Sequence, residues 1–272
     1  MKFTKMHGCG NDYIYIDCRE GVPDNISDLA VRLSDRHKGI GGDGIICICS
    51  SDKADFLMRI FNADGSEGKM CGNGIRCVAK YVFDKGLTDK HHLLIDSLSG
   101  VKIIDIDPKA RPCDEETWVT VDMGKPEIES LDETIRLSDG TELTGCSISM
   151  GNPHFVCFAD ESPSDEKVLV KGPLAERHER FPDRTNIEFA RLIGKDEIEM
   201  RVWERGSGET MACGTGACAT AVAAIAKGLT ARDVTVHLRG GELRISLDDR
   251  GHVLMTGPAT TVFEGVILMI ND

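Results

Sequence analysis

Two of the eleven cysteines stand in matching surroundings. Cys71 opens the motif Cys-Gly-Asn-Gly and Cys213 opens Cys-Gly-Thr-Gly, and a segment with helical spacing of apolar residues follows each motif. The N-terminus of a helix has free backbone N–H groups and the positive end of the helix dipole, and both favour an anion. We therefore expect a lowered thiol pKa at both cysteines. The glycines also let a ligand carboxylate approach the main chain closely.

A pair of equivalent thiols suits a reaction that inverts a stereocentre. A base removes the α-proton from one face, an acid returns a proton to the opposite face, and the roles exchange in the reverse direction. A thiol pKa of about 8.5, lowered by the helix end, provides both forms near neutral pH. The two helix N-termini can hold the substrate carboxylate and stabilise the charge that develops. The pattern predicts an amino-acid racemase or epimerase that requires no cofactor and no metal.

Two other interpretations of the cysteines are open at this point. Free cysteine is often a small buried hydrophobe, so the motifs could simply close two copies of a strand-to-helix connection. The thiols could also form a redox pair, which predicts one attacking and one resolving thiol in unlike surroundings. The surroundings of Cys71 and Cys213 match, and this favours the acid–base interpretation.

The chain contains two copies of one plan. Shifting the sequence by 142 residues, the separation of Cys71 and Cys213, aligns both motifs together with identical or similar residues around them. The matched segments are 58–61 with 200–203, 67 with 209 and 85–86 with 227–228. A shift of 141 aligns 10–11 with 151–152 and 33–37 with 174–178. The duplication predicts two pseudosymmetric domains.

The repeated unit is predicted to be a strand, a glycine-rich turn and a helix. Apolar and polar residues alternate in the two strands, and apolar residues recur with helical spacing after each cysteine. Segment 217–226 is apolar nearly all round, so we expect that helix at the centre of its domain. The predicted strands are 56–61, 101–106, 198–203, 234–238 and 243–247, and the predicted helices begin at about 73 and 217. The class is α+β, with 107–116 as the expected linker between the halves.

Composition narrows the kind of protein. A length of 272 residues allows two domains, and the net charge of −13 argues against a nucleic-acid partner and favours a small-molecule substrate. We expect no membrane segment, because no run of 18 or more apolar residues is present, and no signal peptide, because the first residues have neither an apolar h-region nor a small-residue cleavage site. The expected location is cytoplasmic, with reduced thiols.

Five segments together resemble the diaminopimelate epimerase family along nearly the whole chain. They are KMHGCGNDYIYID at 5–17, FNADGSEGKMCGNGIRC at 61–77, GNPHFV at 151–156, TNIEFA at 185–190 and WERGSGETMACGTGACA at 203–219. The resemblance implies interconversion of LL- and meso-diaminopimelate in lysine and peptidoglycan precursor biosynthesis, without pyridoxal phosphate. It also implies a homodimer and two domains, each a curved mixed or antiparallel sheet around a central helix, with substrate bound between them. The expected domains are 1–117, joined by a C-terminal strand at 263–272, and 118–262.

The resemblance also assigns roles to residues of this sequence. Toward the LL isomer, Cys213 is the expected proton acceptor and Cys71 the donor, with His154 and Glu204 beside them. The expected substrate contacts are Asn11, Asn62, Asn152, Asn186, Glu204, Arg205 and the backbone of Gly72, Asn73, Gly214 and Thr215. Two positions depart from the family: Gly44 stands where many members have Gln, and Phe263 stands where members often have a tyrosine in the dimer contact.

Arg205 interrupts the internal repeat, because its counterpart 142 positions earlier is Ala63. A substrate with a second carboxylate at its far end needs one such asymmetric anchor, and arginine offers a bidentate fork. A proline or hydroxyproline racemase shares the paired cysteines, but its first motif resembles Cys-Gly-His, and its substrate would leave Arg205 without a role. A non-catalytic amino-acid-binding protein is the alternative from another class.

Overall fold

The computed structural model describes residues 1–268 and divides into two compact units. Unit 1 comprises Met1–Val121 and the described residues from Gly257 onward, and unit 2 is Asp122–Thr256. The first boundary lies a few residues beyond the expected 117, and the return to unit 1 begins earlier than the expected 263. Residues 269–272 of the expected C-terminal strand lie outside the described residues.

Both connections between the units run inside strands. They are β8 (Glu116–Gly124) and β17 (Val253–Val266). The expected linker at 107–116 is therefore wrong, because most of it is the loop that joins β7 (Lys102–Ile106) to β8 within unit 1. There the Cys113 N–H donates to Asp84 Oδ1 at 3.0 Å. Proline and acidic residues mark a loop, but they do not show whether a hydrophobic core ends there.

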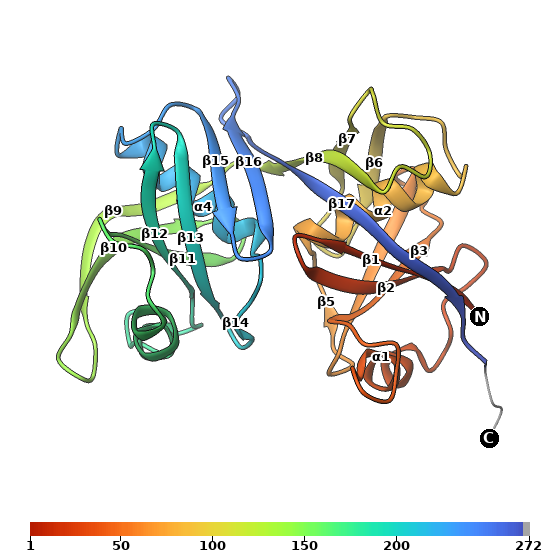
Figure 1. The fold of residues 1–272 in the computed structure, drawn as a ribbon, viewed down its shortest axis with the longest axis horizontal. Helices are drawn as coiled ribbons and strands as arrows, with labels where there is room; N and C mark the ends of the chain where they lie inside the picture. The colour runs from red at the N-terminus through yellow and green to blue at the C-terminus, as the bar shows by residue number, and fades with distance from the viewer. Residues whose placement is uncertain (269–272) are drawn as a thin grey trace. The chain divides into compact units, whose positions relative to one another are not determined.

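Unit 1 is a mixed sheet wrapped around helix α2 (Figure 1). Its remaining elements are β1 (Lys2–Gly8), β2 (Asn11–Asp17), α1 (Ile26–Ser34), β3 (Gly44–Cys49), β4 (Phe56–Asn62), β5 (Glu67–Gly68), α2 (Gly72–Asp84) and β6 (His92–Asp96). Strands β2 and β3, and β4 and β6, pair in parallel. The β1–β2, β3–β4, β6–β7 and β7–β8 pairs are antiparallel. Because β17 pairs with both β1 and β8, the sheet closes on itself.

Unit 2 repeats this topology around helix α4 (Figure 1). Its elements are β9 (Glu127–Arg136), β10 (Glu142–Ser149), β11 (Pro153–Phe158), the π-helix η1 (Glu166–Lys171), α3 (Gly172–Glu176), β12 (Asn186–Gly194), β13 (Glu197–Glu204), β14 (Gly208–Glu209), α4 (Gly214–Ala226), β15 (Asp233–Leu238) and β16 (Gly241–Leu247). The parallel pairs β11–β12 and β13–β15 correspond to β2–β3 and β4–β6 of unit 1. The predicted α+β class, with duplicated sheets around central helices, is confirmed.

The two central helices end in the same way. Gly86 and Gly228 follow them with φ of 65° and 69°, a region that glycine enters without steric cost. The next N–H in each copy donates to the carbonyl five residues back, from Leu87 to Val82 and from Leu229 to Ala224, both at 2.9 Å. This is the hydrogen bond of a Schellman cap, and it stops both helices at equivalent positions.

Helix α4 lies at the centre of unit 2, as the sequence predicts. Nearly every residue from Gly214 to Ala224 is buried, and the helix contacts β9 to β13, β15 and β16. Its small side chains allow strands to approach on all sides. Helix α2 buries one apolar row, which includes Ile75, Val78 and Val82. These packed helices give the preceding cysteines a rigid support.

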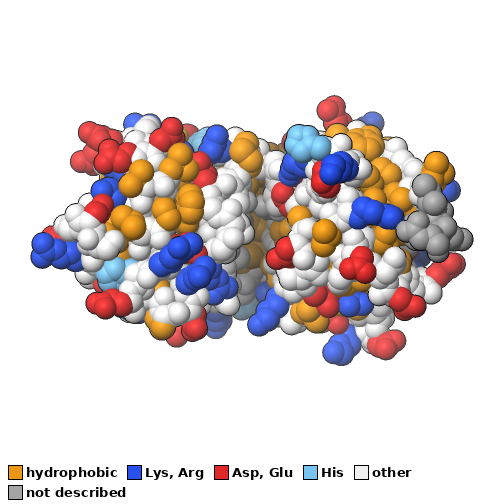
Figure 2. Space-filling view, turned by 90° about the horizontal axis from the view of Figure 1, so that it is seen from below, with side chains coloured by type: hydrophobic (Ala, Val, Ile, Leu, Met, Phe, Trp, Pro, Cys, Tyr) orange, Lys and Arg blue, Asp and Glu red, His pale blue; other side chains and the backbone are white. Residues whose placement is uncertain are grey.

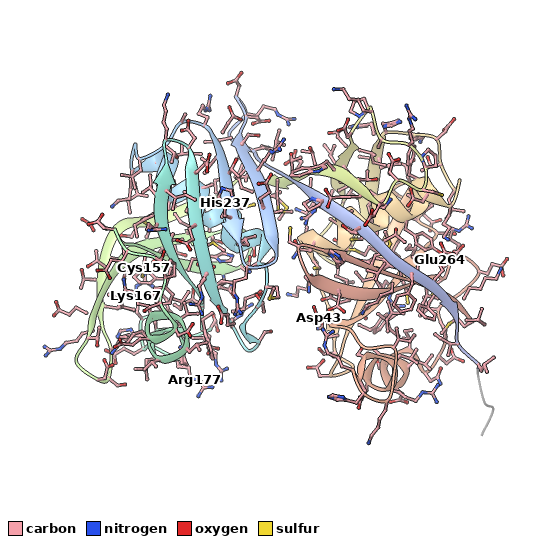
Figure 3. The ribbon with its side chains drawn as sticks, in the orientation of Figure 1. Asp43, Cys157, Lys167, Arg177, His237 and Glu264 are labelled. Atoms are coloured by element: carbon pink, nitrogen blue, oxygen red, sulfur yellow. The ribbon has the colours of Figure 1, made fainter. Side chains whose placement is uncertain are left out.

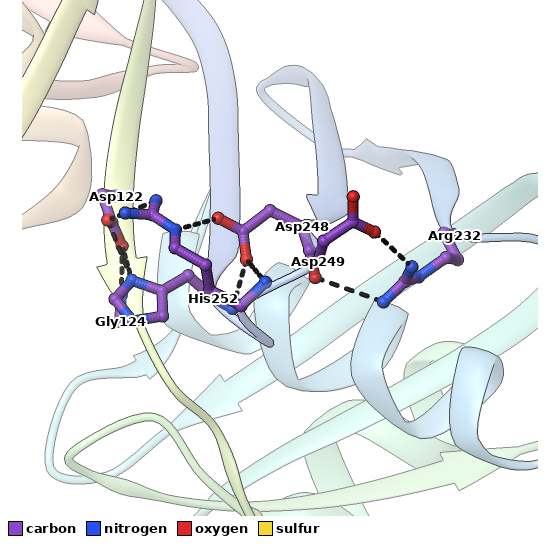
Figure 4. Close-up of polar contacts among 7 residues, drawn as sticks. Asp122, Gly124, Arg232, Asp248, Asp249 and His252 are labelled. Carbon is purple, nitrogen blue, oxygen red and sulfur yellow. Dashed lines mark hydrogen bonds and ion pairs between the residues drawn. The ribbon is translucent and has the colours of Figure 1, made fainter.

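Charged side chains of both signs are mixed on the face of each unit seen in Figure 2. Within unit 2, ion pairs fasten β8 to the turn that precedes β17 (Figure 4). The Asp122 carboxylate contacts His252 Nδ1 at 2.9 Å, and Asp248 accepts from Arg250 at 2.8 Å. None of the helices among residues 1–268 is long and apolar enough to cross a membrane.

Candidate active site

Cys71 is the N-cap of α2. Its backbone is extended, with φ −137° and ψ 114°, and its Sγ accepts the Gly74 N–H at 3.3 Å. The same sulfur lies 3.2 Å from Asn11 Oδ1, so the thiol S–H donates to that carbonyl oxygen. The predicted place of this cysteine at a helix mouth is present in the structure, and Asn11, an expected substrate contact, lies beside its sulfur.

Asp43 determines which end of the Asn11 amide faces the sulfur. Asn11 Nδ2 donates to Asp43 Oδ2 at 2.7 Å, and Arg36 holds the other oxygen of that carboxylate at 3.0 Å. Because Nδ2 is turned to Asp43 (labelled in Figure 3), Oδ1 is left to accept from Cys71. A carbonyl oxygen stabilises the thiol and repels the thiolate. Asp43 was missed in the sequence, where its glycine-rich surroundings indicate only a turn.

The other residues of unit 1 that were expected to contact substrate make hydrogen bonds within unit 1. Gly72 and Asn73 are the first residues of α2, and the fully buried Arg76 donates to the Gly72 carbonyl at 3.3 Å and to Asn73 Oδ1 at 3.1 Å. Asn62, the last residue of β4, donates to Ser66 Oγ at 3.0 Å. The side chain of Asn62 is thus held within the β4–β5 turn.

Gly44 occupies a position that admits no side chain. A Cβ placed there would lie 2.2 Å from the Phe61 carbonyl oxygen and 3.0 Å from Tyr13 Cε1. Because the nearer obstacle is backbone of the paired strand β4, the clash cannot be relieved by a rotamer change. The contact that a Gln side chain would make is therefore absent from this chain.

Cys213 is the N-cap of α4 in nearly the same conformation, with φ −118° and ψ 109°. Its Sγ accepts the Gly216 N–H at 3.4 Å and lies 3.6 Å from Thr215 Oγ1. The sulfur belongs to a side chain that is almost completely buried. The two cysteine caps are therefore alike in backbone and differ in their surroundings.

The expected lowering of the thiol pKa is wrong for Cys213. Burial, followed by the nearby carboxylates of Glu204 and Glu188, raises the pKa of this thiol well above its ordinary value. The hydrogen bonds from Thr215 and Gly216 act in the opposite direction. A helix N-terminus contributes about 0.3–1 kcal/mol, which is too little to offset a fully desolvated charge beside two acids.

Glu204 ends β13 next to this sulfur, and its pKa is raised because the side chain is buried. Hydrogen bonds from Thr210 and Cys213 and the proximity of His154 moderate that rise, and the Thr210 hydroxyl donates to Glu204 Oε1 at 2.5 Å. A buried carboxyl group with a raised pKa can exchange a proton with a neighbouring thiol.

His154 on β11 is fully enclosed and held at both ring nitrogens. Its Nδ1 lies 2.7 Å from Glu188 Oε1, and its Nε2 lies 3.2 Å from Asn152 Oδ1. Asn152 Nδ2 donates to Thr215 Oγ1 at 3.3 Å. Unit 2 therefore brings the predicted residues His154, Asn152 and Thr215 together beside Cys213. Glu188 was missed, although an acid inside the strand-like segment TNIEFA was an available signal.

Asn186 and Arg205 are also neighbours in unit 2. Asn186 Nδ2 donates to the Pro153 carbonyl at 3.0 Å, and its Oδ1 accepts the Arg205 N–H at 2.9 Å. The Asn186 amide thus fixes the backbone that carries Arg205, and its side chain is largely occupied. The guanidinium of Arg205 is exposed and donates to the Asp183 carbonyl at 3.3 Å.

The arrangement of each unit can support acid–base chemistry at a sulfur atom. All eleven cysteines are free thiols. Within residues 1–268, no three His, Cys, Asp or Glu side chains gather closely enough to hold a metal ion. The groups of the two units that can take part in such chemistry are the two thiols, Glu204 and the His154–Glu188 pair.

Solved structures share this fold at low sequence identity. A phenazine biosynthesis protein of the PhzF family from Bacillus anthracis aligns with a TM-score of 0.74 and 16% identity over 99% of both chains. A hydroxyproline epimerase from Agrobacterium vitis aligns with a TM-score of 0.70 and 16% identity, over 97% of this chain and 91% of that one.

Sequence relatives are much closer. A diaminopimelate epimerase of Bacteroides thetaiotaomicron is 51% identical over 97% of both chains. One from Methanococcus maripaludis is 48% identical over 98% of this chain and 99% of its own. The model of the family described as diaminopimelate epimerase matches residues 3–129 and 146–262, which include both cysteine caps. This chain therefore belongs to the diaminopimelate epimerase family.

Proposed function

We propose that this protein interconverts LL- and meso-diaminopimelate, with Cys71 and Cys213 as the two proton-transferring groups. The observation that carries the proposal is the duplicated N-cap: each sulfur accepts a backbone N–H at the start of a buried helix. Family membership supports the isomerase activity and the diaminopimelate substrate. It also favours this substrate over the proline-type alternative, since relatives at about half identity carry the diaminopimelate name.

In the LL-to-meso direction, Cys213 is the acceptor. Because its pKa is raised, the Cys213 thiol needs a partner that takes its proton before it can act as thiolate, and the adjacent Glu204 carboxylate is placed to accept that proton. The Cys213 thiolate then takes the α-proton from the substrate. Cys71, whose S–H is held by Asn11, delivers its proton to the opposite face and becomes the thiolate. The reverse reaction exchanges these roles, so the protons balance in each direction.

The substrate carboxylate at the reacting centre requires donors that do not move during the reaction. We assign this role to the backbone N–H groups of Gly72, Asn73, Gly214 and Thr215 at the two helix N-termini. Asn11, Asn62, Asn152 and Asn186 remain the proposed amide contacts, and Arg205 is the proposed anchor of the distal carboxylate. Glycine at 72 and 214 leaves the main chain open to an approaching ligand.

The test is the replacement of each cysteine by alanine. Cys71→Ala and Cys213→Ala should each abolish formation of meso-diaminopimelate from the LL isomer, with unchanged thermal melting, because one-sided proton transfer cannot invert the centre. Cys113→Ala, at an exposed cysteine, is the matched control and should keep full activity. An alanine variant at 71 or 213 with more than a trace of turnover would refute the two-base scheme. Absence of α-proton exchange by the wild-type protein in D2O would instead favour the binding-protein alternative.

We also propose a homodimer. The described part of β17 exposes Val262, Phe263 and Val266 by 53%, 45% and 63%, which supports an apolar contact along this strand. Analytical ultracentrifugation should give twice the mass of the chain, and Phe263→Glu should shift the equilibrium toward monomer. A monomeric wild-type protein at micromolar concentration would contradict the proposal.

A further inference from the structure

The two halves of the chain differ at one buried position beneath the cysteine caps. A Cβ added at Gly74 would lie 2.6 Å from Ile46 Cδ1, whereas a Cβ added at Gly216 would lie 2.7 Å from Glu188 Oε1. Ile46 and Glu188 are also 142 residues apart, the offset of the cysteines. The duplicated fold therefore places an aliphatic side chain under the Cys71 cap and a carboxylate under the Cys213 cap.

Glu188 lies in the interior of unit 2, where an acid is costly unless it has a partner. Its side chain is completely buried, and Oε1 lies 2.7 Å from His154 Nδ1. Its Oε2 has no hydrogen-bond partner among the described residues. The strand packs well with an isoleucine at the equivalent place in unit 1, so packing alone does not explain the acid.

A continuous chain of contacts leads from Glu188 to the sulfur of Cys213. In the orientation observed, His154 Nε2–H donates to Asn152 Oδ1 at 3.2 Å, and Asn152 Nδ2 donates to Thr215 Oγ1 at 3.3 Å. Thr215 Oγ1 lies 3.6 Å from Cys213 Sγ, and because a thiolate can only accept, the Thr215 O–H donates to the sulfur when Cys213 is the thiolate. In that form every link from His154 onward donates toward the sulfur. Such a chain stabilises a negative charge on Cys213.

The equivalent amide in unit 1 points the other way. Asn11 and Asn152 correspond at an offset of 141, yet Asn11 presents its carbonyl oxygen to Cys71 while Asn152 donates from Nδ2 to Thr215, the neighbour of the Cys213 sulfur. Asp43 sets the first orientation by accepting from Asn11 Nδ2. For Asn152 the determinant is the His154 Nε2–H, which donates to Asn152 Oδ1, and Glu188 holds the ring in this position through Nδ1 on its opposite side.

We propose that Glu188 is a positioning residue for the epimerisation: by holding His154 it fixes the direction of the chain through Asn152 and Thr215, so that the chain donates to Cys213. Glu188 and Asp43 thereby give opposite hydrogen-bond polarity to two thiols with the same backbone setting. Cys213 is prepared as the proton acceptor and Cys71 as the donor. This inference rests on the proposed two-thiol function. It adds the residue that makes the surroundings of Cys213 differ from those of Cys71.

The contact between Nδ1 and Oε1 holds one proton, which either atom can carry. Taken alone, the negative charge of Glu188 would destabilise the Cys213 thiolate, as does that of Glu204. The same charge also raises the pKa of Cys157 on β11, although burial is the larger cause there. Cys157 is labelled in Figure 3. When the proton resides on His154, the pair is neutral overall, and the aligned donors remain to act on the sulfur.

The test is a double-mutant cycle with Glu188→Ile and His154→Leu. Glu188→Ile installs the residue that unit 1 carries at this place, so the fold should be kept. We expect kcat for diaminopimelate to fall roughly tenfold or more, equivalent to about 1.4 kcal/mol or more, with KM little changed. In the His154→Leu background the same substitution should cause no further loss, because Glu188 acts through His154.

Glu188→Gln is the conservative variant. Its amide can donate to Nδ1 and leave the Nε2–H in place, so it should retain most of the activity that Glu188→Ile loses. Glu176→Gln is the matched control, since Glu176 is a buried acid of the same unit that contacts Trp203 and Gly206. Its effect on kcat should be the same with and without His154→Leu.

Two results would overturn the proposal. One is wild-type kcat in a folded Glu188→Ile protein, and the other is an equal loss from Glu188→Ile in both backgrounds. If Glu188→Ile does not fold, the cycle is run with Glu188→Asp, whose shorter side chain cannot reach His154 Nδ1, and the same criteria hold. Failure of the two-thiol function is separate, because it would appear as turnover by the Cys71→Ala or Cys213→Ala protein.

Discussion

Arg205 should select the substrate by its distal carboxylate. The guanidinium is exposed and donates a 3.3 Å hydrogen bond from one terminal nitrogen to the Asp183 carbonyl. Its backbone is held by Asn186, so the side chain projects from a fixed point. We predict that Arg205→Ala lowers kcat/KM for diaminopimelate much more than for lysine, which has the same α-centre but no second carboxylate.

The size of the effect follows from the donors that Arg205 has available. A guanidinium has five N–H donors, and the contact with Asp183 uses one, which leaves a pair for bidentate binding of a carboxylate. A hydrogen bond to a charged group contributes about 1.5–3 kcal/mol. Because Arg205 is exposed to solvent, we expect the two bonds of the fork together to contribute no more than this range for one bond. A loss of about 1.5–3 kcal/mol corresponds to a decrease of roughly 10- to 150-fold in kcat/KM. Arg205→Lys keeps the charge and loses the planar fork, so its effect should be intermediate.

The assay compares the two substrates on each variant. Formation of meso-diaminopimelate from the LL isomer is followed by chiral chromatography, and α-proton exchange of lysine in D2O is followed by NMR at high enzyme concentration. The wild-type preference for diaminopimelate should narrow in Arg205→Ala, and thermal melting should be unchanged. An equal fold-loss on both substrates would show that Arg205 supports the reacting centre or the fold, and the idea of a distal anchor would have to be abandoned.

Two further predictions concern the thiols. Glu204→Gln removes a negative charge that raises the pKa of Cys213, so the limb of the kcat–pH profile that reports Cys213 deprotonation should move to lower pH while kcat falls; a limb that moves upward would contradict the sign. Asp43→Ala should release the Asn11 amide and lower kcat with little change in melting temperature, and unaltered kcat would show that Asn11 is oriented by something else.

Local patterns in the sequence were sufficient to predict the repeated architecture. The spacing of Ile75, Val78 and Val82 predicted α2, and Gly86 indicated where that helix can end; Gly228, its match in the repeat, ends α4 in the structure. The apolar composition of 217–226 predicted that α4 is enclosed on all sides, and the structure confirms it. These features depend on periodicity and on backbone conformation, which neighbouring residues determine.

Features that depend on distant parts of the chain could not be predicted in this way. The turn rich in proline and acids at 107–116 was interpreted as a linker, but only the closed sheet of unit 1 shows that β8 continues past it.

What the sequence by itself determined about this protein is the duplication, the two helix mouths and the cysteines that open them. Tertiary structure decided how those two thiols differ. Cys71 and Cys213 have the same local motif, so a helix-end argument predicts the same pKa effect at both. The direction found at Cys213 depends on burial and on Glu188 and Glu204, which the sheet brings in from other strands. Electrostatic effects on a buried group are set by the atoms around it in space, and these come from strands remote in the sequence.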